Sequence, residues 1–341
     1  MIDVPAKIDK FEFEEELGAG HFGVVYKGRN SNLNADRAIK LIPFSSDMEL
    51  EGLLEEARNL HACEEQHTVR VFDAVRINHK GDDFLAIEME LLAEGSLLDR
   101  AKRDGLSFSE ILTSIRHTLL ALSSAHRTGI IHRDVKPGNI LIAGPRYKLG
   151  DFGISFLKSK SNYTNDDIYV RHAPPECLNG SPADEVSDVY AVGMTLFRLC
   201  RPSSEIKLDP ASFNVWRTSH KVKTLPEYLG IPSYVPKRLR SVIKKATAIN
   251  RADRYQSASE MLAAVNKLRI ELPWKPNKQS SKWTAQSGAS AYEAYIESTA
   301  KGYMCRYKRN GRTVSGWQSV ATTRTAAEAK LADLISTSML R

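Results

Sequence analysis

Residues 131–141 read IHRDVKPGNIL, and residues 151–153 read DFG. Two acids, an amide and a lysine stand close together here, namely Asp134, Asp151, Asn139 and Lys136. Phosphoryl transfer from a metal-bound nucleotide needs an acid to orient the attacking hydroxyl, an acid and an amide to hold Mg²⁺, and a cation for the migrating charge. The sequence therefore predicts a phosphotransferase site built around these two motifs.

The two motifs resemble the catalytic loop and the magnesium motif of the Hanks-type protein kinases. The resemblance implies an α+β, bilobal protein kinase fold, with a β-rich N-lobe at residues 8–92 and a helical C-lobe at residues 93–272. It also implies ATP as the phosphate donor and proteins as the acceptors. The spacing of Asp134 and Lys136 is similar to that of serine/threonine kinases rather than tyrosine kinases.

The resemblance assigns a role to each polar residue of the motifs. Asp134 is expected to accept a hydrogen bond from the substrate hydroxyl and to take its proton late, while Lys136 contacts the γ-phosphate. Asn139 and Asp151 are expected to hold Mg²⁺, with Mn²⁺ as an alternative metal. The expected catalytic set is Asp134, Lys136, Asn139, Lys40 and Glu56.

A glycine-rich turn precedes this region, with glycines at positions 18, 20 and 23. Glycine lets backbone N–H groups approach phosphates where a Cβ would collide. A strand follows the turn, which argues against a dinucleotide-binding fold, because that fold needs a helix here. We expect Phe22, near the tip of the turn, either to cap the phosphates or to pack within the hairpin.

Lys40 stands in an alternating strand, and the helix that follows offers it a partner. Ser46 and Glu49 form a capping-box pattern at the start of this helix. Glu56 falls on or beside the face that packs inward, whereas Glu55 is the competing register and should face outward. A buried acid needs a cation, so we expect Glu56 to pair with Lys40. In the protein kinases that the sequence resembles, this pair fixes the lysine on the α- and β-phosphates.

Residues 84–92 predict a strand that runs into the boundary between the lobes. The resemblance makes Met89 the gatekeeper and the backbone of Glu90 to Leu92 the hinge that pairs with adenine. An ordinary buried strand leading into a loop would show the same residues. The nucleotide contacts that the resemblance implies are Gly18, Gly20, Phe22, Gly23, Val25, Ala38, Lys40, Met89, Glu90, Leu92, Leu141 and Asp151.

Arg133 precedes the expected catalytic acid, and an arginine there can pair with a phosphate on the activation segment. The candidate phosphate acceptors are Ser159, Ser161 and Thr164. A polar loop without modification explains the same three residues. The closing segment, Tyr169 to Glu176, departs from the family pattern, because Tyr169 and Pro174 stand where threonine and alanine are usual. The acceptor preference therefore stays open.

Two further residues resemble structural positions of the family. Asp188 resembles the acid that grips the backbone of the catalytic loop, and Arg254 resembles the arginine that pairs with Glu176. Ser107 and Glu110 predict the capped start of the long helix that leads to the catalytic loop.

Composition excludes several other classes of protein. The 341 residues are 42% hydrophobic, which is typical of a soluble globular protein with more than one core. We see no signal peptide and no apolar run long enough to span a membrane. The four cysteines are Cys63, Cys177, Cys200 and Cys305. They lack metal-ligand spacing and fit a reducing cytoplasm.

The basic character of the chain belongs to its tail. From Lys275 onward there are eleven basic and four acidic residues, a difference equal to the whole-chain net charge of +7. Residues 273–290, rich in Lys, Pro, Ser and Gln, predict a linker. Residues 291–299, 303–308 and 313–320 predict strands, and Thr325 with Glu328 predicts the start of a helix.

This expected β-β-β-α module, residues 291–341, resembles the small N-terminal DNA-binding domain of phage-type integrases. Bases alternate with aromatics in it, as in many nucleic-acid binders. The residues concerned are Tyr303, Arg306, Tyr307, Lys308, Arg309, Arg312 and Trp317. A protein-docking module with solvated bases explains the same pattern, so the partner is a nucleic acid or a protein.

The expected function is that of an active cytoplasmic serine/threonine protein kinase that phosphorylates proteins, including itself, with the basic module targeting substrates or partners. One alternative is a nucleotide-binding pseudokinase scaffold, against which the complete set of catalytic residues argues. A small-molecule kinase on the same fold is the other.

Overall fold

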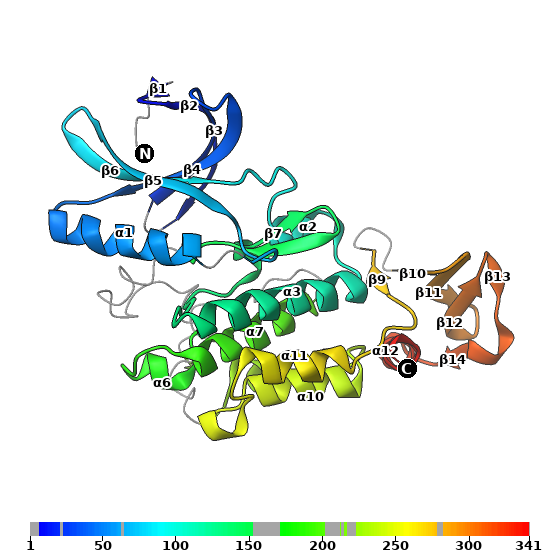
Figure 1. Ribbon diagram of the computed structural model, residues 1–341. Helices are drawn as coiled ribbons and strands as arrows, with labels where there is room; N and C mark the ends of the chain where they lie inside the picture. The colour runs from blue at the N-terminus through cyan, green and yellow to red at the C-terminus, as the bar shows by residue number, and fades with distance from the viewer. Residues whose placement is uncertain are drawn as a thin grey trace.

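The structure is a computed structural model that describes residues 7–20, 23–62, 65–152, 171–201, 212, 215–216, 223–277 and 282–340. An N-terminal lobe built on a sheet stands above a helical lobe, and a small third unit lies beside the helical lobe (Figure 1). The expected two-lobed arrangement, with a β-rich N-lobe and a helical C-lobe, is confirmed. In the described part of the chain, no helix is long and apolar enough to cross a lipid bilayer.

The N-terminal lobe is a six-stranded antiparallel sheet with one helix beside it. The strand order is β1-β2-β3-β4-β6-β5. Its elements are β1 (Lys7–Ile8), β2 (Phe11–Gly20), β3 (Gly23–Asn30), β4 (Ala35–Pro43), α1 (Asp47–Ala62), β5 (Val71–His79) and β6 (Asp82–Met89). Leu53 of α1 packs against Ile42, Leu85 and Ile87 of the sheet, and the Ser46 hydroxyl caps α1 by accepting a hydrogen bond from the Glu49 N–H.

The C-terminal lobe is helical around α7. Its elements are α2 (Leu97–Asp104), α3 (Phe108–Arg127), η1 (Pro137–Asn139), β7 (Ile140–Ala143), β8 (Arg146–Leu149), α6 (Pro175–Leu178), α7 (Glu185–Leu199), α9 (Leu225–Leu229), α10 (Lys237–Ala246), η2 (Arg251–Asp253) and α11 (Ala258–Asn266). The predicted capping box at Ser107 and Glu110 is present at the start of α3. Along α7, every residue from Val186 to Phe197 is buried.

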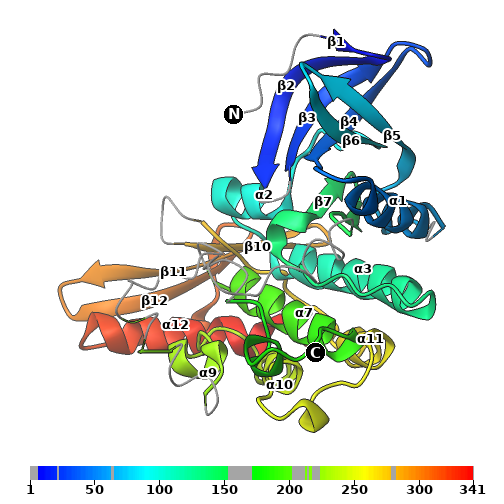
Figure 2. The same ribbon diagram turned by 90° about the vertical axis from the view of Figure 1, so that its left-hand side faces the viewer.

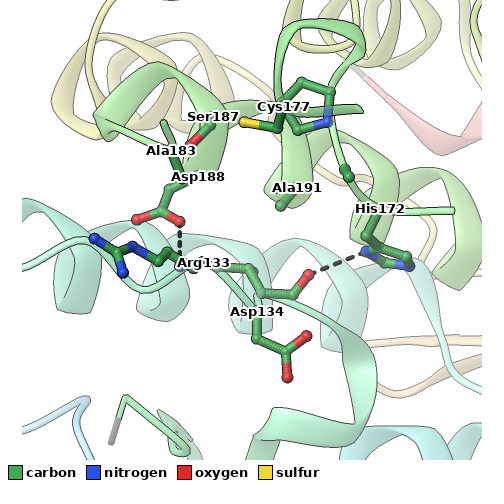
Figure 3. A pocket seen from close by; sticks show the side chains of 11 residues that line it. Arg133, Asp134, His172, Cys177, Ala183, Ser187, Asp188 and Ala191 are labelled. Carbon is green, nitrogen blue, oxygen red and sulfur yellow. Dashed lines mark hydrogen bonds between the residues drawn. The ribbon is translucent and has the colours of Figure 1, made fainter. Parts of the chain in front are cut away.

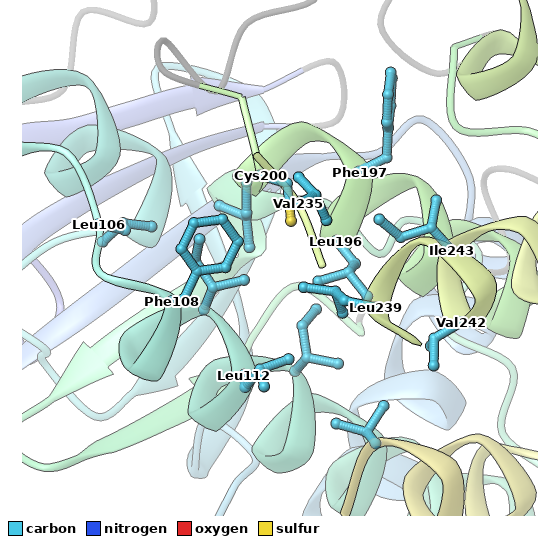
Figure 4. Packing of buried hydrophobic residues seen from close by; sticks show 14 of the residues in the cluster. Leu106, Phe108, Leu112, Leu196, Phe197, Cys200, Val235, Leu239, Val242 and Ile243 are labelled. Carbon is cyan, nitrogen blue, oxygen red and sulfur yellow. The ribbon is translucent and has the colours of Figure 1, made fainter. Parts of the chain in front are cut away.

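Close packing around α7 fixes the lobe. Figure 4 shows Leu196 and Phe197 of α7 among side chains from α3 and α10. Gly193 lies against α10, where a Cβ would come within 2.7 Å of the Ala246 Cβ. Helix α7 is therefore held at a fixed depth, which matters because three of its side chains contact the catalytic loop or the segment after it.

The third unit contains more strands than the sequence predicts. Its elements are β9 (Lys275–Pro276), β10 (Trp283–Ser287), β11 (Ser290–Thr299), β12 (Gly302–Arg309), β13 (Arg312–Thr313), η3 (Ser315–Trp317), β14 (Ser319–Ala321) and α12 (Arg324–Met339). Strands β13, β12, β11, β10 and β9 form the sheet in that order, and β14 also pairs with β12. Helix α12 runs along β11 and β12 (Figure 2).

Three boundary predictions for this unit are wrong. The predicted linker, residues 273–290, contains β9 and β10, because the backbone of β10 pairs with β11 on one side and with β9 on the other. The predicted strand at 313–320 is divided into β13, η3 and β14. The helix begins at Arg324 with Thr323 as its cap, two residues before the predicted start, since the Thr323 side chain accepts the Ala326 N–H.

The module of residues 275–340 shares the hydrophobic core of the C-terminal lobe. Trp274 is fully buried at the junction, and its indole N–H donates to Ser338 Oγ of α12 at 2.9 Å. The Trp274 carbonyl accepts the N–H of Phe108, the first residue of α3, at 3.1 Å. The module is thus packed against the kinase lobe, not attached by a flexible tether.

Candidate active site

A two-stranded ribbon brings the two motifs of the expected site together. Strands β7 and β8 pair with Ile140 opposite Leu149, so the residues before and after this pair meet at one end of the ribbon. The Gly150 N–H donates to the Asn139 carbonyl there, at 2.8 Å. Asn139 and Asp151 therefore lie at the same end of the ribbon because of its register.

The catalytic loop is fastened to α7 by Asp188, as the family resemblance predicts. The Asp188 carboxylate, 1% exposed, accepts the backbone N–H groups of His132 and Arg133, both at 2.8 Å. Figure 3 shows Asp188 directed at the loop from the start of α7. Arg133 has φ +65°, a value that a residue with a side chain adopts at some energetic cost. The paired N–H groups hold the backbone in this conformation next to Asp134.

His132 joins the catalytic loop to the strand that carries Asp151. Its Nδ1 accepts the Asp134 N–H at 3.2 Å, so its Nε2 carries the proton and donates to the Gly150 carbonyl at 2.9 Å. The Phe152 ring packs on His132 with centroids 4.5 Å apart. A histidine whose two nitrogens are used in this way is a packing and linking residue rather than a base.

Asp134, Lys136 and Asn139 form one hydrogen-bonded group. Lys136 Nζ lies 2.9 Å from Asp134 Oδ2, and Asn139 Nδ2 donates to the same oxygen at 3.0 Å. Asn139 Nδ2 also donates to the Asp134 backbone carbonyl at 2.9 Å. The side-chain oxygen of Asn139, which is chemically suited to a hard cation, is not the atom used in these contacts.

Lys40 reaches from β4 across the cleft and makes an ion pair with Asp151. The Lys40 side chain is 6% exposed, whereas that of Asp151 is 37% exposed and faces the opening. Asp151 has φ +60°. The side chain of Glu56, the partner expected for Lys40, lies outside the described residues, so that pairing stays a prediction.

A cavity of about 410 Å³ lies between the lobes and ends at these groups. It is lined by ten of the twelve residues expected to contact the nucleotide, namely Gly18, Gly23, Val25, Ala38, Lys40, Met89, Glu90, Leu92, Leu141 and Asp151. Phe22 lies outside the described residues, and for Gly20 only the backbone is described. The volume is within the range of small-ligand sites, and Lys136 and Asn139 lie at its wall.

The same cavity has lining residues that the sequence did not reveal. Val69 and Ser96 are two of them, and they come from chain segments with no motif of their own. Val69 is placed there because its N–H donates to the Leu149 carbonyl of β8, at 3.0 Å. Hydrophobic spacing carries no signal for such a long-range backbone contact.

The Glu90 side chain is occupied within the hinge. Its Oε1 accepts the Arg70 N–H at 2.7 Å and lies 2.5 Å from Lys148 Nζ. The expected adenine contact would use the Glu90 backbone, which these contacts leave in place and hold against β8.

The activation segment is only partly described. Ser159, Ser161, Thr164 and Tyr169 lie outside the described residues, as does Gly153. At the end of the segment, both carboxylate oxygens of Glu176 bind the Arg254 guanidinium, at 2.6 and 2.8 Å, which confirms the predicted pair. Pro174 is the N-cap of α6, a position where a proline is tolerated because no helical N–H is lost.

His172 is a buried residue of this segment that the sequence reading did not single out. Its Nδ1 lies 3.0 Å from the Val135 carbonyl, and its Nε2 lies 2.9 Å from Arg198 Nη1. Figure 3 shows His172 directed at the catalytic loop beside Asp134. Burial and the nearby Arg198 hold the pKa of the His172 imidazole well below its usual value.

Comparisons with known proteins identify the family of the chain. Residues 11–265 match the family model described as "Protein kinase domain". Relatives include the serine/threonine-protein kinase dst2 of Dictyostelium discoideum, 33% identical over 65% of this chain and 20% of its own length. The serine/threonine-protein kinase PrkC of Bacillus subtilis is 28% identical over 75% of this chain and 40% of its own length. The chain thus spans less than half the length of these curated relatives.

A solved structure supports the fold. The kinase domain of PknI from Mycobacterium tuberculosis aligns with a TM-score of 0.54 at 23% identity, over 76% of this chain and 96% of that one. The family match over residues 11–265 shows that the chain belongs to the protein kinase family, and the relatives that it resembles are serine/threonine kinases.

Proposed function

We propose that this chain transfers the γ-phosphoryl group of ATP to serine and threonine hydroxyls of proteins, including its own. The observation that carries the proposal is that Lys136, Asn139 and Asp151 line the 410 Å³ cavity together with Lys40, while Asp134 is bonded directly to Lys136 and Asn139. An acid, an amide, a second acid and two cations are the groups that phosphoryl transfer uses.

Asp134 is the residue that meets the acceptor. Its Oδ2 already accepts two hydrogen bonds, from Lys136 and Asn139, which hold the carboxylate in one orientation. The same two hydrogen bonds position the other carboxylate oxygen, Oδ1, to accept the proton of an incoming hydroxyl. Lys136 then contributes positive charge next to the group in transfer, where charge develops.

Lys40 and Asp151 act at the other side of the phosphates. Their ion pair keeps the buried lysine and the carboxylate at the cavity wall. On nucleotide binding, Lys40 would exchange the carboxylate for phosphate oxygens, and Asp151 would exchange the lysine for the metal. Asn139 and Asp151 fit a divalent cation, because Mg²⁺ takes few protein oxygens and completes its shell with phosphates and water. Mg²⁺ or Mn²⁺ held by these two residues would neutralise charge on the phosphates.

The apolar walls of the cavity suit a nucleobase. Val25, Ala38 and Leu141 lie on it beside Met89, and the hinge backbone from Glu90 to Leu92 offers the polar groups of a base-pairing edge. The arrangement favours an active enzyme over the pseudokinase alternative, since ten of the twelve expected nucleotide contacts line the cavity and Asp134 stands beside Lys136 and Asn139.

We propose that the C-terminal module serves partner or substrate targeting, with a protein rather than a nucleic acid as its ligand. On β12, Tyr303, Cys305 and Tyr307 share one face by strand alternation, and Cys305 contacts α12 there. Arg306 and Lys308 lie on the opposite face. The alternation of bases and aromatics along β12 therefore reflects the two faces of one strand, and the aromatic beside Lys308 on the outer face is Tyr295 of β11.

Charge on the outer face of the module is also partly balanced. Arg306 binds Glu297 at 2.7 Å, and Lys308 stands opposite Glu293 in the register. A phosphate backbone would have to displace these acids. A gel-shift titration of the full chain with DNA and RNA at low salt checks this proposal: absence of salt-sensitive binding supports it, and binding that Arg306→Ala with Arg309→Ala weakens would overturn it.

The proposed reaction is tested by incubation of the full chain with γ-labelled ATP, Mg²⁺ and a generic protein acceptor. We expect label in both proteins, and after acid hydrolysis in phosphoserine and phosphothreonine. Mapping the labelled peptides shows whether Ser159, Ser161 or Thr164 is modified. Label confined to a small-molecule acceptor would support the alternative of a metabolite kinase.

The free, buried thiols of Cys177, Cys200 and Cys305 fit the cytoplasmic location that we propose with this activity.

A further inference from the structure

The backbone on the far side of Asp134 is held by two side chains. The Val135 carbonyl, which belongs to the residue that follows Asp134, accepts a hydrogen bond from Thr195 Oγ1 at 3.2 Å. His172 Nδ1 approaches the same carbonyl at 3.0 Å. Val135 is itself fully buried, so this carbonyl has no access to bulk water and needs such partners.

The chemistry of its neighbours fixes the state of His172. A carbonyl oxygen can only accept, so the proton must be on Nδ1. A guanidinium can only donate, so Nε2 must present its lone pair to Arg198, 2.9 Å away. His172 is therefore a neutral imidazole in one defined tautomer, a donor toward the catalytic loop and an acceptor toward α7. A proton on Nε2 would face the Arg198 guanidinium, which is why this state persists when the pH falls.

Helix α7 thus supports the catalytic loop on both sides of Asp134. Asp188 holds the N–H groups of His132 and Arg133 before it, and Thr195 and Arg198 act on the Val135 carbonyl after it, Arg198 through His172. The three α7 residues are seven and three positions apart, a spacing that places them on one helix face. Because α7 is buried along its length, this face is a rigid reference for the loop.

We propose that His172 is a positioning residue for phosphoryl transfer: it connects Arg198 of α7 with the Val135 carbonyl and so sets the orientation of the Asp134 carboxylate. The proposal rests on the proposed role of Asp134. His172 also comes from the segment that ends at Glu176, so it transmits the position of that segment to the loop. Loss of the His172 contact leaves the Val135 carbonyl with Thr195 alone and lets the loop relax. A displacement of about 1 Å at a reacting group costs up to about 100-fold in rate.

Three substitutions at position 172 separate this role from simple packing. His172→Phe keeps a ring of similar size and removes both polar contacts. His172→Asn places an amide N–H near the position of Nδ1 and keeps the donor to Val135. His172→Gln places its amide near Nε2 and favours the contact with Arg198. Arg198→Met removes the guanidinium while leaving His172 in place.

The readouts are kcat and KM for ATP and for a protein acceptor, with thermal unfolding and binding of a fluorescent ATP analogue as checks on the fold. We expect His172→Phe to lower kcat by about 10- to 100-fold with KM for ATP changed less than about threefold. His172→Asn should recover kcat to within about fivefold of the wild type. Arg198→Met should lower kcat by a smaller factor than His172→Phe, since Thr195 and the imidazole still hold Val135.

Two results would overturn the proposal: a wild-type kcat for folded His172→Phe, or equal losses in His172→Phe and His172→Asn, which would indicate packing alone. If His172→Phe does not fold, the comparison of His172→Asn with His172→Gln decides, because only the former keeps the donor to Val135. Failure of the proposed function is distinguished by Asp134→Asn. An active Asp134→Asn refutes the role of Asp134, whereas an inactive Asp134→Asn beside a fully active His172→Phe refutes the positioning role alone.

Discussion

The guanidinium of Arg254 has no exposed surface and lies against Glu176, binding both carboxylate oxygens at 2.6 and 2.8 Å. Arg254 also donates to the carbonyls of Ala248 and Ile249, so four hydrogen bonds fix it between α6 and the chain before α11. The Tyr190 ring of α7 lies under the guanidinium, 4.9 Å from its centre. The pair therefore ties the end of the activation segment to the core of the lobe.

We expect Arg254→Met to lower the free energy of unfolding by about 3 kcal/mol, because removal of one partner leaves the other charge and two carbonyls unpaired. Arg254→Lys should recover little, since a lysine cannot bind both carboxylate oxygens in a fork. Urea unfolding measures both. The matched control is Arg251→Met, whose pair with Asp184 is about half exposed and is worth less than about 1 kcal/mol. Equal effects at the two positions would refute the importance of burial here.

The C-terminal module should stabilise the kinase lobe. Trp274→Ala empties a fully buried site between α3 and α12 and should cost about 3 to 5 kcal/mol. Trp317, 43% exposed, stacks on Tyr307 with centroids 5.3 Å apart, and Trp317→Ala should cost less than about 1.5 kcal/mol. Differential scanning calorimetry of the full chain compares them. A module that melts independently, with the lobe unaffected by Trp274→Ala, would contradict the shared core.

Acid should weaken the fold through histidines whose pKa is lowered in the folded state. His117 stacks on His67, with ring centroids 3.9 Å apart, and its Nδ1 accepts the Tyr147 N–H at 3.1 Å. Burial, followed by the neighbouring His67, lowers the pKa of His117 to about 4. The folded pKa lies below the unfolded value of about 6.5, so the unfolded chain binds more protons between these values. The stability contributed by His117 is present above pH 6.5 and is lost as the pH falls toward 4.

We expect the midpoint of thermal unfolding to fall between pH 6.5 and pH 4.5. His117→Asn keeps an acceptor for the Tyr147 N–H but cannot titrate, so it should reduce the slope over this range. His172, whose pKa is also lowered, changes stability in the same direction and accounts for part of the slope that remains. A steeper slope in His117→Asn than in the wild type would contradict this assignment.

The site was predictable from the sequence where its groups lie close together in the chain. Asp134, Lys136 and Asn139 fall within six residues, and Asp151 comes directly after the two-stranded ribbon that follows them, so local spacing encodes their meeting at the end of that ribbon. Amphipathic spacing also predicted α3 and its cap. The glycine-rich turn was predicted because glycine has a physical reason to stand near phosphates.

The residues that were missed depend on partners far away in the sequence. His172 gains its role from Arg198 and Val135, which are 26 and 37 positions distant. Residues 273–290 have the composition of a linker, yet Trp274 and Trp283 are inserted against Ser338 and Tyr234. Strand pairing and burial of this kind are decided by tertiary contacts, which outweigh local composition.

The role of Asp134 is tested most directly by the rate of phosphate transfer from γ-labelled ATP in the presence of Mg²⁺, measured for the wild type and for Asp134→Asn. Asparagine has nearly the same shape, so binding of a fluorescent ATP analogue should be unchanged and confirms an intact cavity. We expect steady incorporation into protein serine and threonine by the wild type and a loss of at least about 100-fold in Asp134→Asn. An inactive wild type that still binds nucleotide, or an Asp134→Asn variant of wild-type rate, would contradict this role.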